Sequence, residues 1–128
     1  SNLSITGATT VVGNTWDIHF DNLVVSDGSV TATTPAAIDS TDNTQINYAV
    51  TLNRPGDYYE FTVDMVNSGT LPGKISLVEL NGITAAVEDV IDYSVVHTNN
   101  NTPVAANDIL NSNSSKNIKV KVIYEGGK

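Results

Sequence analysis

The sequence predicts an all-β fold, an antiparallel β-sandwich of jelly-roll or immunoglobulin-like type with at most one or two short helices. Apolar and polar residues alternate in several short runs, which is the pattern of strands that bury one face. Turn residues separate these runs at fairly regular intervals. The composition agrees, because Val and Thr suit pleated strands, whereas Lys, Glu and Arg, which favour surface helices, are scarce.

The alternating runs give the expected strands and their buried residues. The strands cover residues 16–20, 30–34, 46–52, 58–65, 74–80, 90–97 and 117–125. A strong turn at Asn53–Asp57 follows the third of them, since Pro55 presets one dihedral and Gly56 accepts a positive φ. The expected core contains Trp16, Ile18, Phe20, Val50, Phe61, Val63, Val120 and Val122.

Two segments keep a helical alternative. Within 84–93, three apolar residues, Val87, Val90 and Ile91, have helical spacing. In the other segment, Thr102 can cap a single helical turn that begins at Pro103 and extends to Leu110.

The length favours one domain over residues 1–128, because 128 residues with 40% hydrophobic content suffice for one core and not for two. We interpret residues 1–2 as a remnant of tag cleavage and residues 125–128 as a frayed end or linker. The absence of cysteine excludes disulfides and thiolate metal sites.

The charge restricts the partners. A net charge of −8 makes a phosphate backbone or an anionic membrane surface a poor partner, so we expect no nucleic-acid binding. No run of about 18 apolar residues occurs, and we therefore expect no membrane span in this chain. The charge itself indicates no positive partner, and we expect protein partners or self-assembly at the cell surface.

The stretch from Leu52 to Thr70 is the most specific part of the sequence. It combines a Pro-Gly-Asp turn, an alternating strand and an Asn-Ser-Gly-Thr turn. In this it resembles exported surface and matrix proteins of Gram-positive bacteria related to the TasA and camelysin group. Trp16–Phe20 and Ile118–Tyr124 are similar to the first and last strands of that group. The resemblance implies a jelly-roll-like sandwich, export, and a role in extracellular fibres, biofilm matrix or the cell surface.

The camelysin name also carries a metalloprotease activity, which this sequence does not support. No His-Glu-x-x-His motif occurs in it. His19, flanked by Asp17 and Asp21 on one strand face, has side chains able to bind a metal, but a solvated strand face explains the row as well. We expect His97 to be exposed at the end of its strand.

Acidic residues form two clusters, one at Asp39 and Asp42 and one at Glu88, Asp89 and Asp92. Calcium prefers such oxygen ligands, yet neither cluster has the spacing of a known calcium loop, and we interpret both as acidic surface. No nucleophile motif occurs either. We therefore assign no catalytic, cofactor-binding or metal-ligating residue and no cofactor.

The aromatic residues are expected mainly in the core. Alternation directs Trp16, Tyr48, Tyr59, Tyr93 and Tyr124 inward and leaves Tyr58 outside. A sugar-stacking platform is therefore not predicted, although a glycan stays possible as a partner.

These observations favour a non-enzymatic structural domain of an exported bacterial protein, extracellular or at the cell surface, that acts in matrix or fibre assembly. The alternatives are an extracellular ligand-binding module, for glycan or calcium, and a hydrolase. Assembly has a candidate segment, Leu3–Thr6, which can act as a strand donated to a neighbouring copy or as the first strand of its own domain.

Overall fold

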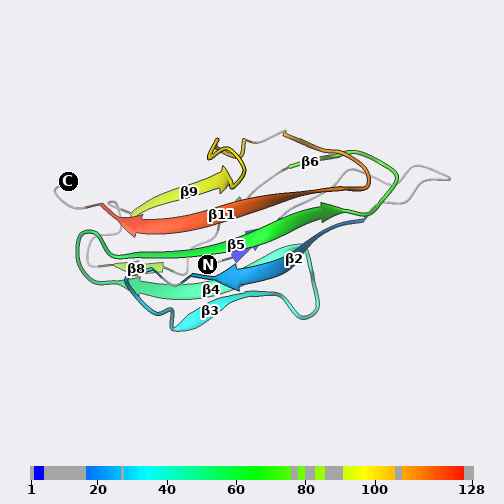
Figure 1. Ribbon diagram of the computed structural model, residues 1–128. Helices are drawn as coiled ribbons and strands as arrows, with labels where there is room; N and C mark the ends of the chain where they lie inside the picture. The colour runs from blue at the N-terminus through cyan, green and yellow to red at the C-terminus, as the bar shows by residue number, and fades with distance from the viewer. Residues whose placement is uncertain are drawn as a thin grey trace.

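The computed structural model describes residues 2–4, 17–26, 28–75, 78–79, 83–85, 91–105 and 108–125. These residues form eleven strands and no helix, which confirms the predicted all-β class (Figure 1). The strands are β1 (Asn2–Ser4), β2 (Ile18–Val25), β3 (Thr34–Ile38), β4 (Gln45–Leu52), β5 (Tyr58–Asn67), β6 (Gly73–Lys74), β7 (Val78–Glu79), β8 (Ile83–Ala85), β9 (Ile91–His97), β10 (Ile109–Leu110) and β11 (Ser114–Tyr124).

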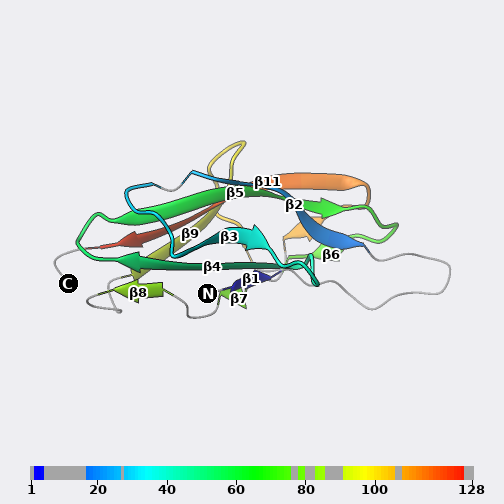
Figure 2. The ribbon, with the colours of Figure 1, turned by 90° about the horizontal axis from the view of Figure 1, so that it is seen from below.

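The strands form a sandwich of two main layers, seen one above the other in Figure 2. One layer is a four-stranded antiparallel sheet in the order β2-β5-β11-β9. The other has the order β3-β4-β1-β7, and β8 pairs with the end of β4. Strands β10 and β6 form a separate antiparallel pair. The β4–β8 pair is parallel, which is the one departure from the predicted antiparallel pairing among the described strands.

The four-stranded sheet is built around the long pair β5 and β11. Their register runs over ten positions, from Asn67 opposite Ser114 to Tyr58 opposite Ile123. In β5 every second residue is buried, and β11 shows the same alternation from Ile118 onward. Strict alternation therefore fixes which face of this sheet covers the core.

The core lies between the two layers and contains most of the residues expected there. Seven of the eight predicted core residues are buried, and the eighth, Trp16, lies outside the described residues. Tyr48 and Phe61 pack edge to face across the layers, with ring centroids 5.4 Å apart. The remaining buried apolar residues are Ala32, Ala36, Ile46, Leu52, Tyr59, Met65, Ile75, Leu110, Ile118 and Tyr124.

Several expected strands differ in extent. Those expected at 16–20 and 117–125 lie at Ile18–Val25 and Ser114–Tyr124. The strand expected at 30–34 lies at Thr34–Ile38 and contains Pro35. β3 is the outer strand of its sheet, and an outer strand tolerates proline because a residue without an N–H group can face away from the neighbouring strand. The strand expected at 74–80 is divided: Gly73–Lys74 pairs with β10, whereas Val78–Glu79 pairs with β1.

The helical alternatives are not supported where the structure describes them. Pro103 forms a β-bridge with Val96, and Ile109–Leu110 is a strand, so the expected turn of helix at 102–110 is wrong for these residues. In the other segment, Ile83–Ala85 and Ile91–His97 are strands, and residues 86–90 lie outside the described part.

The turn at Asn53–Asp57 is confirmed. The N–H of Asp57 donates to the carbonyl of Arg54 at 3.0 Å, and Gly56 has φ +92°. Pro followed by a glycine of positive φ at the two central positions is the pattern of a type II turn. The Asp57 carboxylate then accepts the N–H groups of Asn53 and Arg54 at 2.9 and 3.1 Å.

Tyr93 was expected inside and is 42% exposed. It lies opposite Val122 and therefore on the inner face of the sheet. However, β9 is the outermost strand of this sheet, and its side chains lie at the margin of the sandwich, where the facing layer covers them less. Alternation predicted the face correctly and the burial wrongly.

The N-terminal segment pairs within its own chain. Leu3 lies opposite Ile46 of β4 on one side and Glu79 of β7 on the other. This arrangement agrees with the alternative that the segment is a strand of its own domain. Ile5 and Thr6 lie outside the described residues.

Candidate functional site

A polar pocket of about 610 Å³ lies beside the end of β9. It is bordered by the end of β9, the loop that follows it, the beginning of β11 and the residue before β10. Amide and hydroxyl side chains make up most of its lining: Asn99, Asn100, Asn117, Thr98, Thr102 and Ser115. Pro103 adds an apolar ring.

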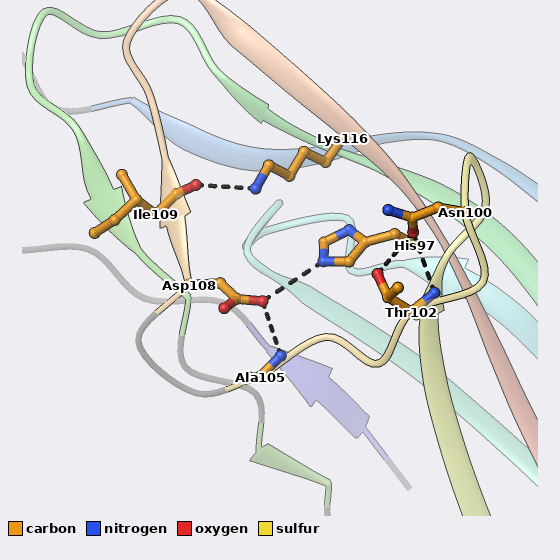
Figure 3. Close-up of polar contacts among 7 residues, drawn as sticks. All are labelled: His97, Asn100, Thr102, Ala105, Asp108, Ile109 and Lys116. Atoms are coloured by element: carbon orange, nitrogen blue, oxygen red, sulfur yellow. Dashed lines mark hydrogen bonds and ion pairs between the residues drawn. The ribbon is translucent and has the colours of Figure 1, made fainter.

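The titratable groups of the pocket are His97, Asp108 and Lys116 (Figure 3). The Nε2 atom of His97 lies 3.5 Å from Oδ2 of Asp108. The His97 side chain is only 14% exposed, so the expectation that it is exposed is wrong. By register it lies opposite Ile118, on the inner face of the sheet, which explains its burial.

The Asp108 carboxylate is held in place by backbone groups. Its Oδ2 accepts the N–H of Ala105 at 2.9 Å, and this hydrogen bond is the main cause that lowers the pKa of Asp108 below its ordinary value. Partial burial acts in the opposite direction, and the neighbouring His97 and Lys116 lower the pKa further. Asp108 is therefore ionised over the physiological range.

The loop after β9 is fixed by its own hydrogen bonds. The N–H of His97 donates to the carbonyl of Thr102, and the N–H of Asn101 donates to the carbonyl of His97, both at 2.8 Å. Oδ1 of Asn100 accepts the hydroxyl and the N–H of Thr102 at 2.6 and 3.1 Å. Asn101 has φ +58°, a left-handed conformation that Asn tolerates better than most residues.

Lys116 closes the pocket on the β10 side. Its Nζ donates to the carbonyl of Ile109 at 3.1 Å, as Figure 3 shows. On the opposite side, Thr98 donates to Oδ1 of Asn117 at 2.8 Å, and Asn117 donates to Asp64 at 2.8 Å. These bonds link the pocket rim to the outer face of β5.

The row around His19 does not form a metal site in the described residues. Nδ1 of His19 contacts Oδ1 of Asp17 at 2.9 Å, so the histidine already has a carboxylate partner. Within the described part of the chain, no group of three or more His, Cys, Asp or Glu residues is placed to hold a metal ion.

The carboxylates of the first acidic cluster, Asp39 and Asp42, stabilise a turn by hydrogen bonds. Oδ2 of Asp39 accepts the hydroxyl of Thr41 at 2.8 Å, and this bond is the main cause that lowers the pKa of Asp39. Oδ1 of Asp42 accepts the hydroxyl and the N–H of Thr44. Asp92 is exposed on β9, and Glu88 and Asp89 lie outside the described residues.

The histidine and carboxylate of the pocket do not match the geometry of a hydrolase triad. In such a triad the carboxylate holds Nδ1, and Nε2 accepts the proton of a serine hydroxyl. Here Asp108 is placed against Nε2 of His97. Among the described residues, neither histidine ring is hydrogen-bonded to a hydroxyl group.

Sequence reasoning missed this pocket because its residues lie in three separate segments. His97 was singled out, whereas Asp108 and Lys116 carried no motif. One signal was present: the run of Asn99, Asn100 and Asn101 is unusual for a short connection and indicates a polar loop.

Comparisons of the chain with protein families, with curated proteins and with solved structures find no match. The described residues contain no helix long and apolar enough to cross a membrane.

Proposed function

We propose that this chain is a non-enzymatic structural domain of an exported bacterial protein that acts in cell-surface or extracellular-matrix assembly. The proposal also includes an extracellular location and kinship with the TasA and camelysin group, which rest on the sequence resemblance. The observation that carries it is the way in which one edge of β4 is completed by short strands.

Strand β4 is eight residues long, and the edge that faces away from β3 is shared by two strands of three residues (Figure 2). β1 pairs antiparallel with residues 45–47, and β8 pairs parallel with residues 50–52. Strands this short contribute few hydrogen bonds each. A longer strand from a second copy would satisfy the whole edge and is therefore a plausible replacement.

Three outer strands, β2, β3 and β9, carry features that oppose strand addition. β3 contains Pro35 and an irregular register, and β2 contains a bulge at Asn22, which has φ +53°. The end of β9 is covered, since Val95 and His97 bond to Val104 and Thr102. These features support the β4 edge, where β1 and β8 pair, as the place of strand exchange.

Exchange of β1 is the simplest route to assembly. The same register that pairs Leu3 with Ile46 inside one chain would pair the β1 of one copy with the β4 of the next. Head-to-tail exchange of this kind builds an open chain of subunits, because each subunit donates one strand and accepts another.

Deletion of residues 1–7 tests the proposal, with sedimentation velocity as the readout of assembly. We expect the deletion to remove the assembled species and to lower the melting temperature of the monomer. Leu110→Ala, which destabilises the fold away from β4, is the control for stability alone and should retain assembly. Unchanged assembly after the deletion would rule out the role of β1.

A second candidate is an extracellular ligand-binding module for glycan or calcium. The observation that favours it is the pocket beside His97. The pocket favours a glycan over calcium, since its lining offers one carboxylate among many amides and hydroxyls. Ligand-induced stabilisation measured by thermal melting, with a neutral sugar panel and with CaCl₂, tests this candidate.

A further inference from the structure

We infer that the pocket beside His97 binds a neutral, hydroxyl-rich ligand, a saccharide unit, with Asp108 and the amide of Asn100 as its main polar contacts. The inference deepens the ligand-binding candidate above, and it does not depend on the assembly proposal. It rests on the size of the pocket, its chemistry, its local charge and its preformed geometry.

The size and lining indicate a small polar ligand. A volume of about 610 Å³ lies within the range of about 300–1,000 Å³ typical of small-molecule sites. Such sites are usually mostly apolar, whereas this one is lined mainly by amides, hydroxyls and charged groups. An apolar cofactor or lipid chain would leave these groups without hydrogen-bond partners, which is costly. A ligand rich in hydroxyl groups would satisfy them.

The polar groups that remain available in the pocket suit a ligand rich in hydroxyl groups. Among the described residues, Oδ1 of Asp108 accepts no hydrogen bond, because Ala105 and His97 both engage Oδ2. Likewise the Nδ2 group of Asn100 donates to no described residue, since Thr102 engages only Oδ1. A carboxylate oxygen accepts and an amide N–H donates. A sugar hydroxyl does both, so different hydroxyls of one saccharide can bond to the two groups.

The local charge favours a neutral ligand. Asp108 is ionised and Lys116 carries a positive charge, so these two groups balance within the pocket. An anionic ligand would be repelled by the negative charge of the whole chain, which is −8. A bare metal cation would find a single carboxylate, and the described residues hold no group of three metal-binding side chains.

The pocket is held in shape before any ligand arrives. Figure 3 shows His97 between the loop that carries Asn100 and the segment that carries Asp108, and both sides are tied by hydrogen bonds. Pre-organisation of this kind reduces the entropy lost on binding. Pro103 and the methyl group of Thr102 supply the apolar contact that the C–H face of a sugar ring requires.

The test is a titration of the ¹⁵N-labelled chain followed by amide chemical shifts. The probes are glucose, galactose, mannose and N-acetylglucosamine as neutral sugars, with glucuronate, inorganic phosphate and CaCl₂ for comparison. We expect saturable shifts confined to residues 97–105, 108 and 115–117 with at least one neutral sugar. No saturable shift with any neutral sugar would overturn the inference, as would a stronger response to glucuronate, phosphate or calcium.

Two variants separate a binding role from a structural one. Asp108→Asn keeps the shape and removes the charge, and we expect about a tenfold weaker affinity for the sugar because a hydrogen bond to a charged acceptor is lost. Asp92→Asn removes an exposed charge from the same strand as His97 and should leave the affinity unchanged. The spectra themselves report whether each variant folds. Equal affinities in a folded Asp108→Asn variant would contradict the assignment. The assembly proposal is unaffected by either outcome, because its readout is sedimentation.

Discussion

Two regions of this sandwich are built in different ways. In the four-stranded sheet, β5 and β11 pair over ten positions and bury every second side chain along most of that length. In the facing layer, the edge of β4 is completed by β1 and β8, strands of three residues each. The first region buries apolar side chains continuously, whereas each short strand of the second pairs with β4 over only three positions. If the proposal of strand exchange is correct, the β4 edge should open more readily than the β5–β11 pair.

The largest expected effect comes from truncating one apolar residue in a long strand and one in a short strand. Phe61 in β5 has no exposed surface and packs against Tyr48, whereas Ile109 in the two-residue strand β10 is 43% exposed. We expect Phe61→Ala to lower the free energy of unfolding by about 3–5 kcal/mol and Ile109→Ala by under about 1 kcal/mol. Urea denaturation measures both. Similar losses in the two variants would contradict the contrast.

Asn67 joins the two kinds of structure and gives the next largest effect. It is 1% exposed, and its Nδ2 donates to the carbonyls of Leu71 and Leu110 at 2.8 and 3.0 Å. Its Oδ1 accepts the N–H of Gly69 at 3.0 Å.

The isosteric substitution Asn67→Asp replaces both donors by an acceptor and buries a charge among carbonyl oxygens. We expect a loss of about 2–4 kcal/mol in the free energy of unfolding at neutral pH, measured by urea denaturation. Asn111→Asp, an exposed position in the turn before β11, is the matched control and should change little. An unchanged free energy of unfolding in Asn67→Asp would contradict the view that the hydrogen bonds of Asn67 hold the end of β5 to β10.

Gly28 and Gly56 have the same φ of +92° but differ in the room for a side chain. Substitution of each by alanine therefore separates the cost of steric overlap from the cost of backbone strain. A Cβ on Gly56 would meet nothing within 4 Å, whereas a Cβ on Gly28 would lie 2.6 Å from the carbonyl oxygen of Tyr58. We expect Gly56→Ala to cost about 1 kcal/mol through the positive φ alone. Gly28→Ala should cost more, because Tyr58 in β5 must also shift. Thermal melting of both variants checks the order.

The smallest expected effect is on the dependence of stability on acidic pH. Hydrogen bonds lower the folded-state pKa of Asp57, chiefly the one donated by the N–H of Asn53, with Arg54 and Ser29 contributing. A carboxyl whose pKa is depressed on folding stabilises the fold above its unfolded pKa, and this contribution is lost as the pH falls through the folded value.

We therefore expect the melting temperature to fall at acidic pH, below the ordinary pKa of aspartate. Asp57→Asn should reduce this acid dependence and lower the melting temperature at pH 7. A variant that keeps the full acid dependence would show that other groups cause it. Asp92→Asn, with an exposed carboxyl, is the control.

The same contrast explains how much the sequence could predict. Alternation over many residues identified β4, β5, β9 and β11, and it gave the correct inner face even for Tyr93. It failed for residues 74–80, where two strands of two residues join different sheets, since no periodicity exists over so short a length.

The candidate site was beyond sequence reasoning for a related reason. His97, Asp108 and Lys116 come from the end of one strand, a loop and the start of another strand, and only the sheet register brings them together. The burial of His97 follows from its place on the same face as Tyr93, opposite Ile118, which alternation along the strand also indicates. The prediction was wrong because it gave more weight to the position at the end of the strand. By contrast, the turn at Asp57 depends on local bonds, and its short Pro-Gly-Asp pattern predicted it.

Exchange of β1 between copies is the central claim, and a designed disulfide tests it most directly. Ser4 and Gln45 lie directly opposite each other in the antiparallel β1–β4 pair, a spacing that suits a disulfide, and the chain has no cysteine of its own. The double variant Ser4→Cys with Gln45→Cys is assembled under reducing conditions, oxidised, and run on a denaturing gel without reductant. Exchange predicts a ladder of covalently linked multimers. A single band of internally cross-linked monomer from assembled material would contradict it.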